Sequence, residues 1–366
     1  MGCFKKVTGR AGVVCSAYII VFGCLIGAAQ PLPCGLELRA NDSTISLEQR
    51  IAELEQQVAQ SGCTELACDS QGCTCCGCRP GWFGSVDYLH WQITRDDLAF
   101  AIDDPAGLGV PNSGAAVRSL DYGFSNGIRA AVGTRTDSGW EIGFRYTHFS
   151  ADDQRSFVPG AGRVLAVQSS PATGLTNADS VSATARLLLN LYDLEAGYWF
   201  DLGDSVSLLA LAGVRFGEVD QHLRARYNGG AFVNGDISVP TDVDLFGGRL
   251  GGAIHYQHSS AVSLFCNTSV TLAASTIQAS RREINAGQTV IDVSRRTEPV
   301  IPQAELSLGA RYSHGPWGIA IAYDWSNWFN LASPLEFADS FNGGVIGATQ
   351  RDLGLHGFSI SASFAY

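Results

Sequence analysis

Apolar and polar residues alternate with a period of two in ten stretches of the chain after residue 81. The last stretch is the clearest. Its apolar side carries Phe358, Ile360, Ala362, Phe364 and Tyr366, and serines dominate its other side. A period of two predicts a strand with one apolar and one polar or small face. The first stretch, Trp82–Trp91, carries aromatic residues on both faces, so its orientation stays open.

The connections between these ten stretches alternate in length, long then short, to the end of the chain. They span residues 93–121, 134–138, 150–183, 201–204, 221–240, 258–260, 280–299, 313–316 and 327–353. An outer-membrane β-barrel has this pattern, because short turns join its strands on the periplasmic rim and longer loops join them on the other. A soluble sandwich, the alternative for one amphipathic strand, does not require it.

We therefore expect an all-β protein: an antiparallel transmembrane β-barrel of about ten strands over residues 81–366, in the outer membrane. An even strand count would leave both termini in the periplasm. Leu208 and Val270 are expected to face lipid near the midplane. The last strand must pair with the first to remove the open edge, and it matches the pattern read by the barrel-assembly machinery. The residues expected in that role are Phe358, Ile360, Phe364 and Tyr366.

The N-terminus reads as a signal peptide over residues 1–29. Lys5, Lys6 and Arg10 precede an apolar stretch that ends near Ile26, and small residues follow it. That order is typical of a secretory signal. An uncleaved membrane anchor and a lipoprotein site at Cys24 are the alternatives.

Residues 30–80 are expected to form a periplasmic helix followed by a cysteine-rich segment. Leu47, Ile51, Leu54 and Val58 make a short heptad stripe within residues 44–61. One interpretation is a coiled coil that joins protomers into a homo-oligomer, and the other is a single amphipathic helix. The stripe is too short to form a stable helix alone.

Six cysteines follow this helix within sixteen residues. They are Cys63, Cys68, Cys73, Cys75, Cys76 and Cys78. Disulfides are favoured for an exported chain because the compartment is oxidising. A zinc site is the alternative, but no histidine lies within the cluster. Six cysteines allow about 15 pairings, and the spacing does not select one.

Composition narrows the partners. Charged residues make up 16% of the chain, below the roughly 25% of soluble domains, and the net charge of −11 argues against nucleic acid as a partner. No run of about 20 apolar residues occurs after residue 30, so no spanning helix is expected there. The lipid of the outer membrane is an expected partner, together with the barrel-assembly machinery and, through residues 44–61, a second copy of the chain.

Ten charged residues fall on the parity expected to line the lumen. They are Arg129, Glu141, Arg145, Asp193, Glu195, Arg215, Arg249, Glu305, Arg311 and Asp324. Five of each sign predict no strong selectivity. A ten-stranded lumen is close to the width that side chains fill, so we expect a narrow or gated pore, restricted by loops 150–183 and 327–353. Arg129 with Glu141, and Asp193 with Arg215, are the expected neighbours, whereas Glu305 and Asp324 would need an arginine or cation between them.

Catalytic residues are not expected. His148 and His90 lie near aspartates at strand ends, but no stretch shows a nucleophile beside an oriented base. We therefore expect no enzyme, no cofactor and no metal. A non-transporting surface barrel, with long loops that serve adhesion or structural roles, is the alternative to a pore.

From Gly81 to Tyr366 the chain resembles the Legionella-type major outer membrane protein family. The matching pieces are Asp87–Trp91, Gly127–Ala130, Trp140–Phe149, Asp193–Gly197, Gly213–Arg215 and Asp352–Phe358. The resemblance implies an outer-membrane barrel that forms a pore and has no catalytic residues. Residues 41–78 lie outside it.

Thiol labelling tests the cysteine-rich segment. If the six cysteines are paired, a maleimide should modify few of them in native exported protein and all of them after reduction. Deleting residues 41–78 should leave a barrel that still inserts but changes its oligomer size. Full labelling without reductant would reject the disulfides, and an unchanged oligomer would reject the coiled coil.

Overall fold

The computed structural model describes residues 81–107, 113–160, 162–170, 173–332, 335–337, 346–348 and 351–366. The predicted signal peptide, helix and cysteine pairs lie outside these residues. The regular secondary-structure elements of the described part are all strands. They are β1 (Gly81–Thr94), β2 (Ala99–Asp103), β3 (Ala116–Ser119), β4 (Ser125–Arg135), β5 (Trp140–Phe157), β6 (Val164–Ala166), β7 (Asn177–Ala178), β8 (Ser180–Asp201), β9 (Val206–Gly229), β10 (Phe232–Gln257), β11 (Val262–Asn285), β12 (Gln288–Thr297), β13 (Val300–His314), β14 (Trp317–Ala332), β15 (Leu335–Phe337), β16 (Ile346–Ala348) and β17 (Arg351–Ala365).

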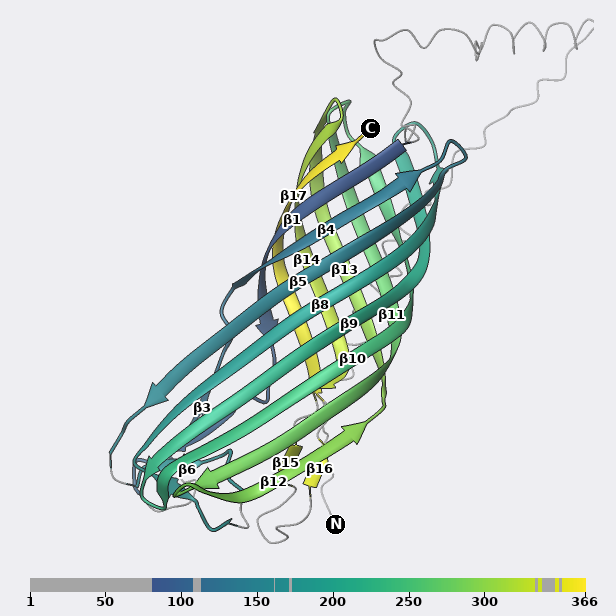
Figure 1. The fold of residues 1–366 in the computed structure, drawn as a ribbon. Coiled ribbons are helices and arrows are strands. Elements are labelled where there is room, and N and C mark those ends of the chain that lie inside the picture. Colours follow the sequence, from purple (N-terminus) through teal and green to yellow (C-terminus); the bar gives the residue numbers. More distant parts are fainter. Residues whose placement is uncertain are drawn as a thin grey trace, which may run out of the picture. The chain divides into compact units, whose positions relative to one another are not determined.

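Ten of these strands close into an antiparallel barrel (Figure 1). Its order is β10-β9-β8-β5-β4-β1-β17-β14-β13-β11, and β11 pairs back onto β10. The last strand lies between β1 and β14, with Phe358 opposite His90 and Tyr323. Each of the ten strands has a partner on both sides, and this closure confirms the predicted fold class and strand number. No helix in the described part of the chain is long and apolar enough to cross a membrane.

An apolar band surrounds the barrel wall between two rows of aromatic side chains. Exposed aliphatic residues of the band include Val86, Leu194, Leu250, Val270, Leu308 and Ile321. The row near the short turns contains Trp82, Trp140, Phe200, Tyr256, Tyr312 and Trp317, and the row near the long connections contains Tyr88, Tyr192, Phe216, Phe246, Tyr323 and Phe358. The predicted assembly residues Phe358, Ile360, Phe364 and Tyr366 are exposed on the outward face.

The distance between the two rows fits a membrane crossing. On β8 the two rows are represented by Tyr192 and Phe200, which are eight positions apart, and a tilted strand crosses a bilayer with about 9–11 residues.

The predicted midplane residue Leu208 does not lie near the middle of this band. It is opposite Phe200 and Ile254, two positions after β9 begins, and so lies at the short-turn edge. Val270 lies opposite Leu250 and Ala304, well inside the band.

Five neighbouring strands, β5 and β8 to β11, extend far beyond the band on the side of the long connections. They have 18 to 26 residues, so much of the connections predicted at 150–183, 221–240 and 280–299 is strand. The polarity of the two faces inverts where the band ends. On β9 and β10 the outward face carries Glu218, Asp220, Asp242 and Asp244, while Val219, Leu223, Val239, Val243 and Leu245 are buried on the inward face.

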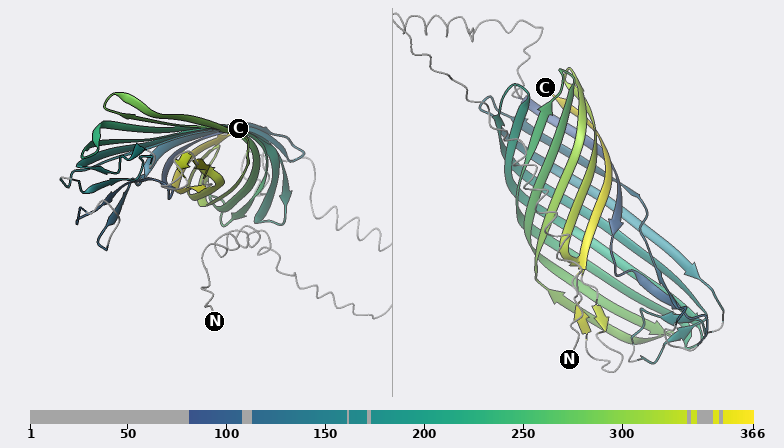
Figure 2. Two further views of the ribbon diagram at one scale, coloured as in Figure 1. Left: turned by 90° about the horizontal axis from the view of Figure 1, so that it is seen from below. Right: turned by 180° about the vertical axis from the view of Figure 1, so that it is seen from behind.

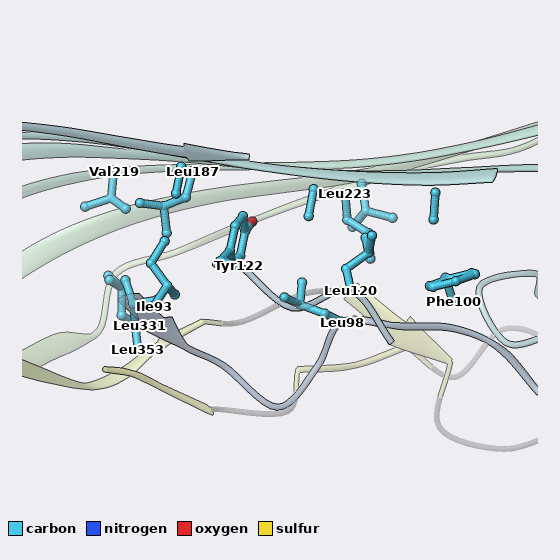
Figure 3. Close-up of a cluster of buried hydrophobic side chains, with 14 of the residues drawn as sticks. Ile93, Leu98, Phe100, Leu120, Tyr122, Leu187, Val219, Leu223, Leu331 and Leu353 are labelled. Atoms are coloured by element: carbon cyan, nitrogen blue, oxygen red, sulfur yellow. The ribbon is translucent and has the colours of Figure 1, made fainter. Parts of the chain in front are cut away.

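A small four-stranded sheet covers this inward apolar face. Its order is β3-β2-β6-β7. Leu98, Phe100 and Leu120 lie beneath Leu187, Val219 and Leu223 of the tall strands (Figure 3). In the view from below, the tall strands curve over these segments (Figure 2). Each fully buried Leu or Phe contributes about 1.5–3 kcal/mol, so the small sheet is held by a core like that of a soluble protein.

The Tyr227 hydroxyl connects this core to the loop segments. It donates a hydrogen bond to the backbone carbonyl of Phe100 on β2 and accepts one, at 3.3 Å, from the backbone nitrogen of Gln168. Burial raises the pKa of this hydroxyl, so it stays protonated and able to donate. The wall of the barrel therefore anchors two long connections at one point.

Paired substitutions on β11 test where the apolar band ends. Val270 and Gln278 both point outward and are exposed, but Val270 lies within the band and Gln278 beyond it. Val270→Arg should cost about 2–4 kcal/mol of folding free energy in lipid vesicles, and Gln278→Arg about 0–1 kcal/mol. Urea titration of vesicle-folded protein measures both, and equal costs would show that the band is misplaced.

Candidate lumen site

Charged side chains cross the interior near the loop-side end of the apolar band. Arg215 on β9 lies opposite Asp193 on β8, with Nε–Oδ1 and Nη2–Oδ2 distances of 2.5 and 2.8 Å. Its Nη1 also donates to Oε1 of Glu305 at 2.8 Å. Because β9 and β13 are not neighbours in the wall, the contact between Arg215 and Glu305 spans the lumen.

Two further arginines join this pair through shared carboxylates. Arg249 donates from Nε to Oε1 of Glu195 at 2.7 Å and also pairs with Glu305. Arg145 lies 3.3 Å from Glu195, measured from Nη2 to Oε2. The side chains of Arg215 and Arg249 are only 3% and 6% exposed. Buried charges are tolerated when they are paired and hydrogen-bonded, and here each buried guanidinium has two carboxylates.

A second group lies on β1, β4 and β14. Arg129 lies between Asp87 and Asp324, with an Nε–Oδ2 distance of 2.6 Å and an Nη2–Oδ2 distance of 3.3 Å. The Trp91 indole nitrogen donates to the same Asp324 oxygen at 3.3 Å. β1 and β17 separate β4 from β14 in the wall, so Arg129 braces strands that do not pair directly.

A third group lies closer to the short turns. Arg135 is directly opposite Glu141, and their Nη2–Oε2 distance is 2.5 Å. The Trp199 indole nitrogen donates to Glu141 at 2.8 Å, and the Arg135 guanidinium lies 4.9 Å from the Trp199 ring centroid. The group therefore combines an ion pair with a cation–π contact.

A cavity of about 420 Å³ lies in the lumen between these ion pairs and the short-turn rim, and we call it the turn-side cavity. At one end it is lined by Arg215, Arg249 and Glu305, and at the other by the β13–β14 turn and the end of β17. Eight of the ten predicted lumen residues line it. They are Arg129, Glu141, Arg145, Arg215, Arg249, Glu305, Arg311 and Asp324. Asp193 and Glu195 instead bind the arginines that do.

The predicted neighbours were only partly right. Asp193 contacts Arg215 as expected, and arginines separate Glu305 from Asp324. Glu141, however, pairs with Arg135 and not with Arg129. The reason is the turn between β4 and β5, where Gly139 has a φ of 86° in the left-handed region and the register places Arg135 opposite Glu141.

Several residues of the site were not found from the sequence. Asp87 and Trp91 lie on the first strand, whose two faces could not be told apart. Arg135 was assigned to a turn, although it shares the parity of Arg129 and could have been found from it. With these residues the inward face of the membrane-spanning half carries six arginines and six carboxylates. They are Arg129, Arg135, Arg145, Arg215, Arg249 and Arg311, with Asp87, Glu141, Asp193, Glu195, Glu305 and Asp324.

A closed barrel with an apolar outer band and a charged interior defines an outer-membrane β-barrel protein. The chain belongs to the family described as the Legionella pneumophila major outer membrane protein precursor, whose model matches residues 75–366. This confirms the resemblance seen in the sequence and the location in the outer membrane. No curated protein matches the chain.

Three solved structures that are similar to this one are a protease, a transporter and an attachment protein. The outer membrane protease OmpT from Escherichia coli has a TM-score of 0.46 and 10% identity, covering 81% of this chain and 100% of that chain. The toluene transporter TodX from Pseudomonas putida has a TM-score of 0.30 and 11% identity, covering 78% and 88%. Ail, the attachment invasion locus protein of Yersinia pestis, has a TM-score of 0.25 and 10% identity, covering 78% and 99%.

The expectation that the chain is not an enzyme needs correction. One of the similar structures is an outer membrane protease, and the enzyme status of this chain is not established. At 10% identity the similarity does not establish enzymatic activity for this chain.

Neutralising Asp193 tests the bracing of the lumen. Asp193→Asn keeps the shape of the side chain but removes a carboxylate that is 1% exposed beside a guanidinium that is 3% exposed. Breaking a buried pair costs about 3–5 kcal/mol. Glu298→Gln, in an exposed pair with Arg296, should cost at most about 1 kcal/mol. Urea unfolding followed by tryptophan fluorescence measures both, and equal costs would show that the lumen pair does not brace the wall.

Proposed function

We propose that the chain forms a narrow, gated pore for small solutes or ions. The observation that supports this best is the cavity of about 420 Å³, which runs from the short-turn rim to the ion pairs around Arg215. A barrel whose only task was structural would not need a cavity lined by charged side chains in its membrane-spanning half. The short turns and both termini are proposed to face the periplasm, as in other barrels of this class.

Two features would act as the gate. The first is the cross-lumen contact of Arg215 with Asp193 and Glu305. The second is the small sheet, because Leu98, Phe100 and Leu120 lie in the apolar core beyond those ion pairs. The sequence analysis expects the connections 150–183 and 327–353 to restrict the pore. We add the segment around β2 and β3 to this proposed restriction. Both features would have to move for a wide pore to open.

Equal numbers of charges on the inward face favour weak selectivity. Six arginines are matched by six carboxylates in the membrane-spanning half, and eleven of these twelve groups, all but Arg311, are joined by the ion pairs named above. Paired charges present little net field to a passing ion. Solute size would then decide passage more than the sign of charge.

The alternative is a surface barrel that does not transport. The tall strands favour it, because they project a charged outward face over an apolar core that is stable without lipid. Such a platform suits adhesion or a structural role. The two functions differ in one measurable property, which is whether opening the ion-pair layer produces current.

Single-channel recording in a planar bilayer tests the pore. Wild-type protein should give small or flickering currents. Arg215→Ala should raise conductance several-fold or destabilise the closed level, because it removes the link between β9 and β13. Arg224→Ala is the matched control, since Arg224 is also on β9 and pairs with an aspartate, Asp236, but on the outward face.

Three results would contradict the proposal. A large, steady wild-type current that Arg215→Ala leaves unchanged would show that these residues do not restrict the lumen. An equal response to Arg224→Ala would show that the effect is unspecific. Silence in every variant, with the folded barrel verified by its shifted mobility on an unboiled gel, would favour the non-transporting alternative.

A further inference from the structure

Arg311 differs from the other inward arginines. Arg129, Arg135, Arg145, Arg215 and Arg249 each have a carboxylate within 4 Å. Arg311 projects from β13 into the same lumen, and no hydrogen bond or ion pair joins it to any residue that the structure describes. Its Nε is buried without a hydrogen-bond partner. A guanidinium has five donors in a fixed fork, and no residue in the described part of the chain accepts a hydrogen bond from Arg311.

The wall around Arg311 is polar and partly basic. The cavity lining here includes Arg135 and His255, together with the hydroxyl-bearing Ser313, Ser361 and Ser363. The three serines lie on β13 and β17, and the two on β17 belong to the serine face seen in the sequence. Arg311 and Arg135 both act electrostatically on the His255 ring. An anion placed here would meet positive charge and hydroxyl donors.

A glycine on the next strand keeps space beside this arginine. A Cβ atom at Gly318 would lie 2.6 Å from the Ser363 hydroxyl oxygen and 3.7 Å from Cδ of Arg311. The first distance is too short for a real contact, so a side chain here would push into the serine and towards Arg311. Small residues around Arg311 therefore leave its guanidinium accessible from the cavity.

The nearby carboxylates do not take up this charge. Asp87 and Glu141 are the acidic groups that interact electrostatically with Arg311. Asp87 is held by Arg129 at 2.6 Å, and Glu141 by Arg135 at 2.5 Å and by the Trp199 indole. Each of these carboxylates already has its own arginine. Among the residues that the structure describes, Arg311 is thus the positive group of the turn-side cavity that remains available to a ligand.

We propose that the turn-side cavity binds a small anion that carries a carboxylate or phosphate group, with Arg311 as its main ligand. The planar fork of arginine matches both groups with two parallel hydrogen bonds. The volume of about 420 Å³ lies within the range of about 300–1,000 Å³ of small-molecule sites. The binding site follows from the cavity, whereas its use as a transport subsite rests on the proposed pore.

Calorimetric titration of the folded full-length barrel with inorganic phosphate, and separately with succinate, tests the site. The two probes distinguish a phosphate ligand from a carboxylate ligand. Wild-type protein should bind at least one of them. Arg311→Ala should weaken that binding about tenfold, equivalent to about 1.4 kcal/mol, and Arg311→Lys should be intermediate because it keeps the charge without the fork. Arg226→Ala is the control, since Arg226 is on the outward face with a side chain 60% exposed.

Each outcome decides the proposal. The proposal is wrong if wild-type protein binds neither probe. It is also wrong if Arg311→Ala binds as tightly as wild-type protein, or if Arg226→Ala weakens binding as much as Arg311→Ala does. Should Arg311→Ala fail to give a heat-modifiable barrel, Arg311→Lys and Arg311→Gln supply the same comparison. Bilayer recordings separate the two proposals. Binding that depends on Arg311 in a barrel that never conducts would retain the site and reject the pore, and conduction without binding would do the reverse.

Discussion

Backbone hydrogen bonding within the apolar band is the constraint on which the rest of the structure depends. Lipid offers no partner to a free N–H or C=O group, so every strand edge in the band must be paired. β17 meets this need by lying between β1 and β14, and β10 by pairing with β11. Closure then assigns the side chains of each strand to two environments. The outward set must be apolar, and the inward set is free to carry charge, provided that the charges are paired.

The period of two was enough to predict the barrel, but it also concealed the tall strands. On β9 the apolar residues of the band, such as Leu208 and Phe216, occupy even positions. Beyond the band they occupy odd positions, such as Val219 and Tyr227. Alternation continues without a break, but its sense inverts where the outside changes from lipid to water. Apolar residues that leave the expected parity were interpreted as the end of a strand, so long loops were predicted where the strands continue.

Parity also predicted the inward charges better than their partners. Arg215 and Asp193 lie in direct register on neighbouring strands, and this pair could be predicted from the turn. Arg129 reaches Asp324 across two intervening strands, and such a contact depends on the curvature of the closed wall. Sequence spacing contains no information about that curvature. The small sheet was missed for another reason: its strands have two to five residues, too few for a period to be recognised.

The two closures of the lumen have different physical consequences. The apolar core around Phe100 excludes water and opens only if buried surface is exposed, at a cost that grows with its area. The ion-pair layer is different, because a guanidinium can exchange one carboxylate for another anion with little change in its hydrogen bonding. Arg215, with two carboxylates and 3% exposure, is poorly placed for such an exchange. Arg311 has no carboxylate to lose within the described residues, so an anion that reaches it breaks no ion pair with them. The same barrel wall thus uses Arg215 as a brace and leaves Arg311 available to bind a ligand. The difference arises because β8 places Asp193 opposite Arg215, whereas the residues opposite Arg311 are Ser263 and Ala320.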